Sequence, residues 1–164
     1  MDINIFRTLH IIFAGMWLIN LISDSVLKGY ILKNKDKSGE KKLIHLYLTF
    51  SNLFGMIGSL GILITGIALV SLYHPYYRFF QMNGNHWLTA KQILMVVLLI
   101  IIGVFVIPTA KKVRSSIGND LENQLGLNDA GYKNLQKLFK LNMVINIIVL
   151  INFLFAVTHR LFGQ

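Results

Sequence analysis

The chain contains no cysteine, and only two prolines and seven acidic residues occur among its 164 positions. Without cysteine it forms neither a disulfide nor a thiolate metal site. Pro75 and Pro108 each lie near the end of an apolar run, so the interiors of the runs lack the residue that breaks helices. The scarcity of acidic residues leaves sixteen Lys and Arg residues and a net charge of +9. Two questions follow: what the apolar runs form, and where the basic residues lie.

Four long apolar runs divide the chain, centred on residues 9–32, 43–72, 87–107 and 138–161. Each is close to the ~20 residues with which a helix crosses the hydrocarbon of a bilayer. We therefore predict an all-α integral membrane protein, a single membrane domain over residues 1–164. Its spans are expected at about 3–33, 40–73, 86–115 and 129–162. Short connections make successive spans neighbours, which predicts an up-down four-helix bundle.

The basic residues gather on one side of these predicted spans. Twelve of the sixteen flank the first and third connections, namely Lys28, Lys33, Lys35, Lys37, Lys41, Lys42, Lys111, Lys112, Arg114, Lys133, Lys137 and Lys140. Because positive residues favour the cytoplasmic side, both basic connections are predicted inside and both the N- and C-termini outside. This distribution favours the lipid bilayer, with its anionic headgroups, over nucleic acid as the partner of the lysine runs.

Ionisable residues inside the spans are the candidate functional residues, because a charged side chain in lipid is expensive and needs a partner. At ~1.5 Å per residue, His10 lies about 10 Å into the first span and Lys91 about 7–8 Å into the third. The two are therefore predicted at a similar depth on the outer side. The other histidines lie near span ends: His74, His86 and His159 on the outer side, and His45 on the cytoplasmic side.

Each of these residues has a simple and a functional interpretation. A histidine near a span end can contact water or headgroups, and Lys91 can extend toward the outer headgroups. Alternatively, an imidazole can ligate iron, with His10, His86, His159 and His45 as the candidate metal ligands. In that case Lys91 either faces an acidic group of a ligand, such as a propionate, or itself ligates iron.

Two further features concern polar and small residues within the spans. Asp24 and His45 are predicted at similar depth on neighbouring helices, where they form a charge-relieving pair or leave His45 for a second site. Asn142 and Asn146 share a helical face and are expected to make interhelical hydrogen bonds. Small residues form a strip on the second span: Ser51, Gly55, Gly58, Ser59, Gly61 and Gly66. This strip predicts either close helix packing or close approach of a flat macrocycle, with Gly55 and Gly58 facing the cofactor.

Two motifs resemble a known group of proteins. The segment RTLHIIFAGMW, residues 7–17, resembles the opening of small bacterial four-helix membrane proteins. These are the haem-binding protoporphyrinogen oxidases of the HemJ type and the related CopD-like and DUF2269 proteins. The segment HWLTAK, residues 86–91, is similar to the Trp-Leu-x-x-Lys opening of the third span in that oxidase. The resemblance implies a haem b site in a bacterial inner membrane, with His10 as a ligand and Lys91 as the functional cation.

The candidate cofactor-binding residues are then His10, Trp17, Gly55, Gly58, His86 and Lys91. Copper handling, which the CopD-like branch implies, fits less well because the six methionines are scattered and form no Met-x-x-Met cluster. Three functions stay open. The chain handles or transports haem; or it is a redox protein, either a cytochrome b-type carrier or a porphyrinogen oxidase; or it is a cofactor-free assembly subunit. A homodimer, formed through the strip of small residues, is a further expectation.

Overall fold

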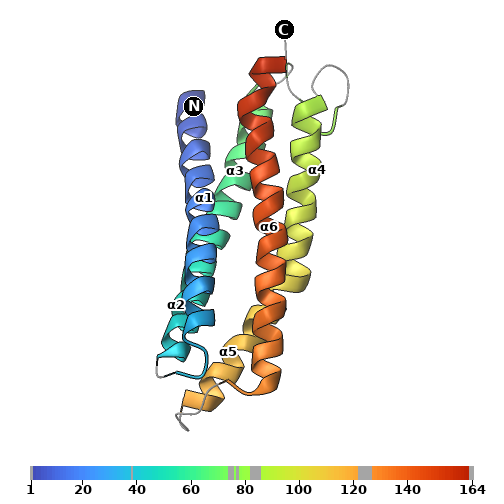
Figure 1. The fold of residues 1–164 in the computed structure, drawn as a ribbon. Coiled ribbons are helices and arrows are strands. Elements are labelled where there is room, and N and C mark those ends of the chain that lie inside the picture. Colours follow the sequence, from blue (N-terminus) through green and yellow to red (C-terminus); the bar gives the residue numbers. More distant parts are fainter. Residues whose placement is uncertain are drawn as a thin grey trace.

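The computed structural model describes residues 2–37, 39–73, 76, 78–81, 86–121 and 127–162, with the side chains of 119–121 and 159–162 excepted. Every regular element in these ranges is a helix (Figure 1). The elements are α1 (Ile3–Lys33), α2 (Glu40–Phe50), η1 (Ser51–Met56), α3 (Ile57–Leu72), α4 (His86–Ile100), η2 (Ile101–Val106), α5 (Ile107–Leu121) and α6 (Asp129–Phe162). The two η elements are π-helical segments that continue the helices on either side.

Four continuous helices in the described part of the chain are long and apolar enough to cross a membrane: Ile3–Lys33, Glu40–Leu72, His86–Gly118 and Asp129–Thr158. The all-helical prediction and the four potential spans are therefore confirmed. The third helix extends to Leu121, beyond the predicted limit at 115. Each helix exceeds the ~20 residues that the hydrocarbon of a bilayer requires.

The four long helices lie side by side (Figure 1). The start of α1, the end of α3, the start of α4 and the end of α6 lie at one end of the molecule, here called the terminal end. The opposite end, here called the basic end, contains the lysine-rich turn between α1 and α2 and the junction of α5 with α6. The α6 helix runs beside α4 and α5 and also contacts α1.

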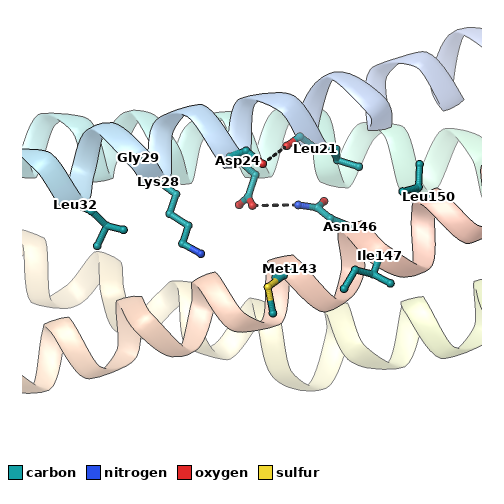
Figure 2. Close-up of a pocket in the computed structure, with 10 residues that line it drawn as sticks. Leu21, Asp24, Lys28, Gly29, Leu32, Met143, Asn146, Ile147 and Leu150 are labelled. Atoms are coloured by element: carbon teal, nitrogen blue, oxygen red, sulfur yellow. Dashed lines mark hydrogen bonds between the residues drawn. The ribbon is translucent and has the colours of Figure 1, made fainter.

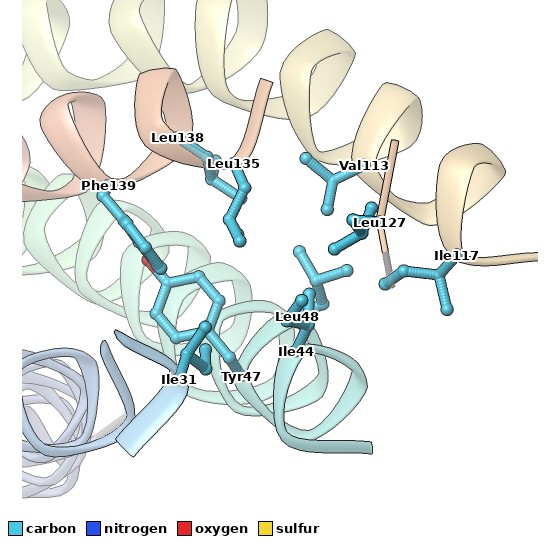
Figure 3. Close-up of a cluster of buried hydrophobic side chains, with 10 residues drawn as sticks. All are labelled: Ile31, Ile44, Tyr47, Leu48, Val113, Ile117, Leu127, Leu135, Leu138 and Phe139. Carbon is cyan, nitrogen blue, oxygen red and sulfur yellow. The ribbon is translucent and has the colours of Figure 1, made fainter. Parts of the chain in front are cut away.

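The basic end has its own hydrophobic core (Figure 3). Side chains from α1, α2, α5 and α6 meet there, together with Leu127, which precedes α6. The ring of Tyr47 lies 5.2 Å from that of Phe139, edge to face, which is a favourable aromatic geometry. The fully buried members include Ile44, Tyr47 and Val113. Because these residues fill the space between helices, the parts of α2 and α5 beyond the apolar runs are fixed to the bundle.

Hydrogen bonds to the Glu40 carboxylate hold the α1–α2 turn against the start of α6. Asp36 adopts a left-handed backbone (φ 61°), and Gly39 does likewise (φ 100°), which reverses the chain in a few residues. The backbone N–H of Asp36 donates to Glu40 Oε2 over 3.0 Å. The Tyr132 hydroxyl donates to the same carboxylate at 2.6 Å. Glu40 is buried, so these donors supply the hydrogen bonds that its carboxylate loses to water.

The strip of small residues packs directly on α1. A Cβ added at Gly58 would lie 3.4 Å from the backbone of Phe13 and of Trp17, and one at Gly61 would lie 2.2 Å from Cγ of Phe13. The Phe13 ring therefore occupies the position that any larger residue at 61 would need. Close approach of helix backbones through small residues is the usual way in which helices associate in lipid.

Gly61→Ala is expected to destabilise the protein by about 1–3 kcal/mol, because the new methyl group must displace the Phe13 ring. Gly15→Ala is the matched control, since a Cβ at Gly15 meets no atom within 4 Å. That control should stay within about 0.5 kcal/mol of the parent or gain from alanine's higher helix propensity. The measurement is reversible unfolding in mixed SDS and detergent micelles. Equal stability of the two variants would contradict the packing of Phe13 on Gly61.

Candidate functional site

His10 is held by α3 near the terminal end. Its Nδ1 lies 2.8 Å from Thr65 Oγ1. The Thr65 hydroxyl itself donates to the backbone carbonyl of Gly61 over 2.6 Å, so its single proton is already used. Thr65 must then accept from Nδ1–H of His10, which leaves Nε2 as the nitrogen with a free lone pair. A histidine whose second nitrogen is fixed by a hydrogen bond in this way has the arrangement of a metal ligand.

The imidazole of His10 packs against α3. A Cβ at Gly66 would lie 3.5 Å from Cε1 of His10, which is ordinary van der Waals contact, so the ring passes close to this glycine. His10 is half-buried, whereas Thr65 is buried. The ring is thus held against α3 and keeps part of its surface exposed. This arrangement fits a ligand that approaches from outside the α1–α3 contact.

Lys91 on α4 belongs to the same region. It lies five residues into α4, which begins at the terminal end as α1 does (Figure 1). The Nζ atom lies 5.8 Å from the centre of the Trp87 ring, within the range of a cation–π contact. Within the described residues, Lys91 has no carboxylate partner. His10, Thr65, Trp87 and Lys91 are here called the terminal-end site, a half-buried imidazole beside an ammonium group that lacks a counter-charge.

The other predicted metal ligands do not join this site. His86 is exposed at the start of α4, and His45 is exposed on α2 toward the basic end. The structure shows no contact of either with His10 among the residues it describes. His159 lies on α6, but its side chain is outside the described part, as is the whole of His74. His10 is therefore the one candidate ligand whose surroundings in the structure resemble a built site, within the described chain.

Three predicted cofactor residues have packing roles instead. Trp17 is 3% exposed and belongs to a core cluster with Met95, Leu98, Ile145 and Val149. Gly58 faces the backbone of α1, and Gly55 faces the Asn20 amide. At Gly58 the backbone of α1 already occupies the face that the expected macrocycle would need, whereas Gly55 is half-buried and lies near the Asn20 amide alone. Close helix packing, the other interpretation of the strip, is what the structure contains.

Asp24 forms a second polar site, in which the predicted partner His45 is replaced by Tyr47. The Tyr47 hydroxyl donates to Asp24 Oδ1 over 2.6 Å, and Asn146 Nδ2 donates to Oδ2 over 3.1 Å. Asn142 Nδ2 lies 2.6 Å from the Tyr47 oxygen and 3.3 Å from Asp24 Oδ1. These four residues, here called the Asp24 cluster, join α1, α2 and α6. The pair of Asp24 with His45 was a wrong prediction, because His45 is exposed and the hydrogen bonds of Asp24 come from Tyr47, Asn142 and Asn146.

A groove opens beside the Asp24 cluster, between α1 and α6 (Figure 2). Its volume is about 490 Å³, within the range of roughly 300–1,000 Å³ found for small-molecule sites. The walls are mainly apolar, with Leu21 and Leu32 on α1 and Ile147 and Leu150 on α6. Lys28 and Met143 project into it from opposite walls (Figure 2). The groove lies beside Asp24, away from His10, and none of its lining residues belongs to the terminal-end site.

Two residues of these sites, Tyr47 and Thr65, were not predicted from the sequence, although the helical spacing around each of them indicates that it faces inward. Tyr47 shares an inward stripe with Ile44, Leu48 and Ser51 at the i, i+3, i+4, i+7 spacing, and His45 lies outside that stripe. Thr65 lies four residues after Gly61 on the strip of small residues, so it faces α1 as the strip does. Periodicity applied to the polar residues would therefore have found both.

No family model, no curated protein and no solved structure matches the chain.

Proposed function

We propose that the chain is a haem b-binding, multi-pass protein of a bacterial inner membrane that handles or transports haem. In this proposal the helices form an up-down four-helix bundle with both termini on the periplasmic side. The observation that carries it is the His10 imidazole, whose Nδ1 is fixed by Thr65 while Nε2 stays available. Haem iron is commonly ligated by such a nitrogen, with the pocket around it setting its use.

Lys91 supports haem over a bare metal ion. An ammonium group beside His10 repels a free cation, but it complements the propionate groups of haem b. One histidine with an ammonium group in the same region is thus better suited to a tetrapyrrole than to an ion.

Haem handling is favoured over electron transfer by the number of ligands near His10. A low-spin cytochrome b uses two axial histidines, and neither His45 nor His86 contacts His10 in the described structure. Among the side chains that the structure describes, His10 is the one candidate ligand in this region, and a haem held by one half-buried side chain would exchange readily. Purified protein with a tightly held, reducible low-spin spectrum would favour the redox alternative instead.

The absorption spectrum of the purified protein tests the proposal directly. In detergent, with haemin added, we expect a Soret band with saturable binding and haem that passes readily to apomyoglobin. Absence of any Soret change on addition of haemin would contradict haem binding of every kind. It would then favour the cofactor-free assembly subunit.

Lys91→Ala is expected to weaken haemin binding at the terminal-end site about tenfold, since a charge-assisted contact with a propionate is lost. The spectrum of the bound haem should not change, because Lys91 does not ligate the iron in this proposal. Lys91→Arg keeps the charge and should restore most of the affinity. If Lys91→Ala removes an axial-ligand band, Lys91 ligates the iron and is not a partner of the propionate.

A further inference from the structure

We propose that the groove between α1 and α6 binds one anionic phospholipid from the membrane leaflet at the basic end. Its phosphate lies between Lys28 and Lys140, and one of its acyl chains follows the apolar walls toward the middle of the bundle. None of the residues that line the groove belongs to the terminal-end site. This inference therefore goes beyond the proposed haem function and does not depend on it.

The length and the walls of the groove fit an acyl chain. From Leu21 to Leu32 the α1 wall rises about 16 Å at ~1.5 Å per residue, which is close to half of the ~30 Å hydrocarbon of a bilayer. The groove thus has about the depth of one leaflet. On the α6 wall, Ile147 and Leu150 are about half exposed. An acyl chain that enters from the surrounding lipid can pack against both walls.

Two lysines lie at one level of the groove, one on each wall. Lys28 projects into the groove from α1, with Nζ 5.5 Å from the centre of the Phe139 ring on α6 (Figure 2). Lys140 directly follows Phe139 and shares a helical face with Met143 and Ile147, which line the groove. Neither lysine has a carboxylate partner among the described residues. Two such cations complement a phosphate group of net negative charge.

The carboxylate of Asp24 does not oppose a phosphate at this level. Asp24 lies one helical turn before Lys28, farther from the basic end, and is 6% exposed. Its oxygens accept hydrogen bonds from Tyr47, Asn142 and Asn146, so its charge is engaged with the bundle. The neutral acyl chain, and not the headgroup, then passes Asp24. The groove is thus cationic toward the basic end and mainly apolar toward the middle, as a phospholipid of that leaflet requires.

Native mass spectrometry of the full-length protein tests the site with two lipids that have identical dioleoyl chains. Wild type is expected to retain one phosphatidylglycerol in preference to phosphatidylcholine, because only phosphatidylglycerol carries a net negative charge. Lys28→Gln should weaken the binding of phosphatidylglycerol about fivefold, the effect of one lysine near a membrane surface. Lys33→Gln is the matched control, because Lys33 is exposed on another face of α1, and it should leave binding unchanged.

A second pair of variants tests the position of the acyl chain. Gly29 lines the groove, and a Cβ there would meet no atom within 4 Å, so the side chain of Gly29→Leu fills part of the groove without a clash at its Cβ. This variant should retain severalfold less phosphatidylglycerol. Gly15→Leu is its control, because a Cβ at Gly15 also meets no atom within 4 Å and Gly15 lies outside the groove. It should bind the lipid as wild type does.

Weaker binding in Lys28→Gln and in Gly29→Leu, with both controls unchanged, would support the site. Equal retention of the two lipids by wild type would overturn it, because the bound molecules would then be ordinary lipid around the bundle. Unchanged binding of phosphatidylglycerol in both Lys28→Gln and Gly29→Leu would overturn it as well. Lipid binding is the readout throughout, so a failure to bind haemin, which overturns the proposed function, leaves this inference standing.

Discussion

His10→Ala lowers the affinity of the terminal-end site for haem by at least about tenfold. Replacing even a residue that only orients a metal ligand costs 10–100-fold in affinity, and removing the ligand itself costs at least as much. The measurement is a haemin titration of the full-length protein in detergent. Leu9→Ala is the control, since Leu9 is the exposed neighbour of His10 on α1 and should leave binding unchanged.

Thr65→Val separates ligation from simple loss of structure. Valine matches threonine in shape but cannot accept from Nδ1–H of His10, so the imidazole loses the hydrogen bond that fixes its tautomer. We expect haem affinity to fall by about 10–100-fold while the protein remains folded. Unchanged occupancy in both His10→Ala and Thr65→Val would remove this region from the haem site altogether.

The helices could be predicted well from the sequence because each of them contains a long run of apolar residues. Runs such as 43–72 contain enough apolar residues to span a bilayer, and their limits follow from where charge begins. The approximate depth of a residue also follows, because the rise per residue is constant along a helix. That is why His10 and Lys91 were expected in the same layer, and in the structure both lie within the first two or three turns of helices that begin at the terminal end.

The direction in which a residue faces was harder to predict than its depth. His45 and Tyr47 differ by two positions, and about 200° of rotation on a helix separates an exposed side chain from a fully buried one. The strip containing Gly55 and Gly58 has the same pattern whether it faces a helix or a macrocycle. Only the position of Phe13 and Trp17 on α1 decides between the two. Partners on other helices therefore limit how far a site can be inferred from one sequence.

Asp24→Ala is expected to destabilise the bundle by about 3 kcal/mol, which is the upper end of the range expected for Gly61→Ala and about twice the loss expected from Asp24→Asn. The substitution leaves the Tyr47 hydroxyl and the Asn146 amide without their acceptor, and Asn142 loses the longer of its two hydrogen bonds while keeping the one to the Tyr47 oxygen. Hydrogen bonds to a charged group are worth about 1.5–3 kcal/mol each in soluble proteins, and about 0.6–2 kcal/mol when both partners lie in a membrane. The loss is measured by unfolding in mixed SDS and detergent micelles.

Asp24→Asn shows whether the charge of Asp24 or the geometry of its hydrogen bonds matters, and Ser25→Ala serves as the control. Asp24→Asn keeps one acceptor oxygen, and the Asn146 amide can turn to present its own oxygen to the new NH₂ group. It should therefore cost about half as much as Asp24→Ala. Ser25→Ala is the control, because the Ser25 hydroxyl is exposed and bonds only to the Leu21 carbonyl of its own helix. If Asp24→Ala were as stable as Ser25→Ala, the cluster would contribute nothing to joining α1, α2 and α6, and a carboxylate buried at this position would need a functional explanation.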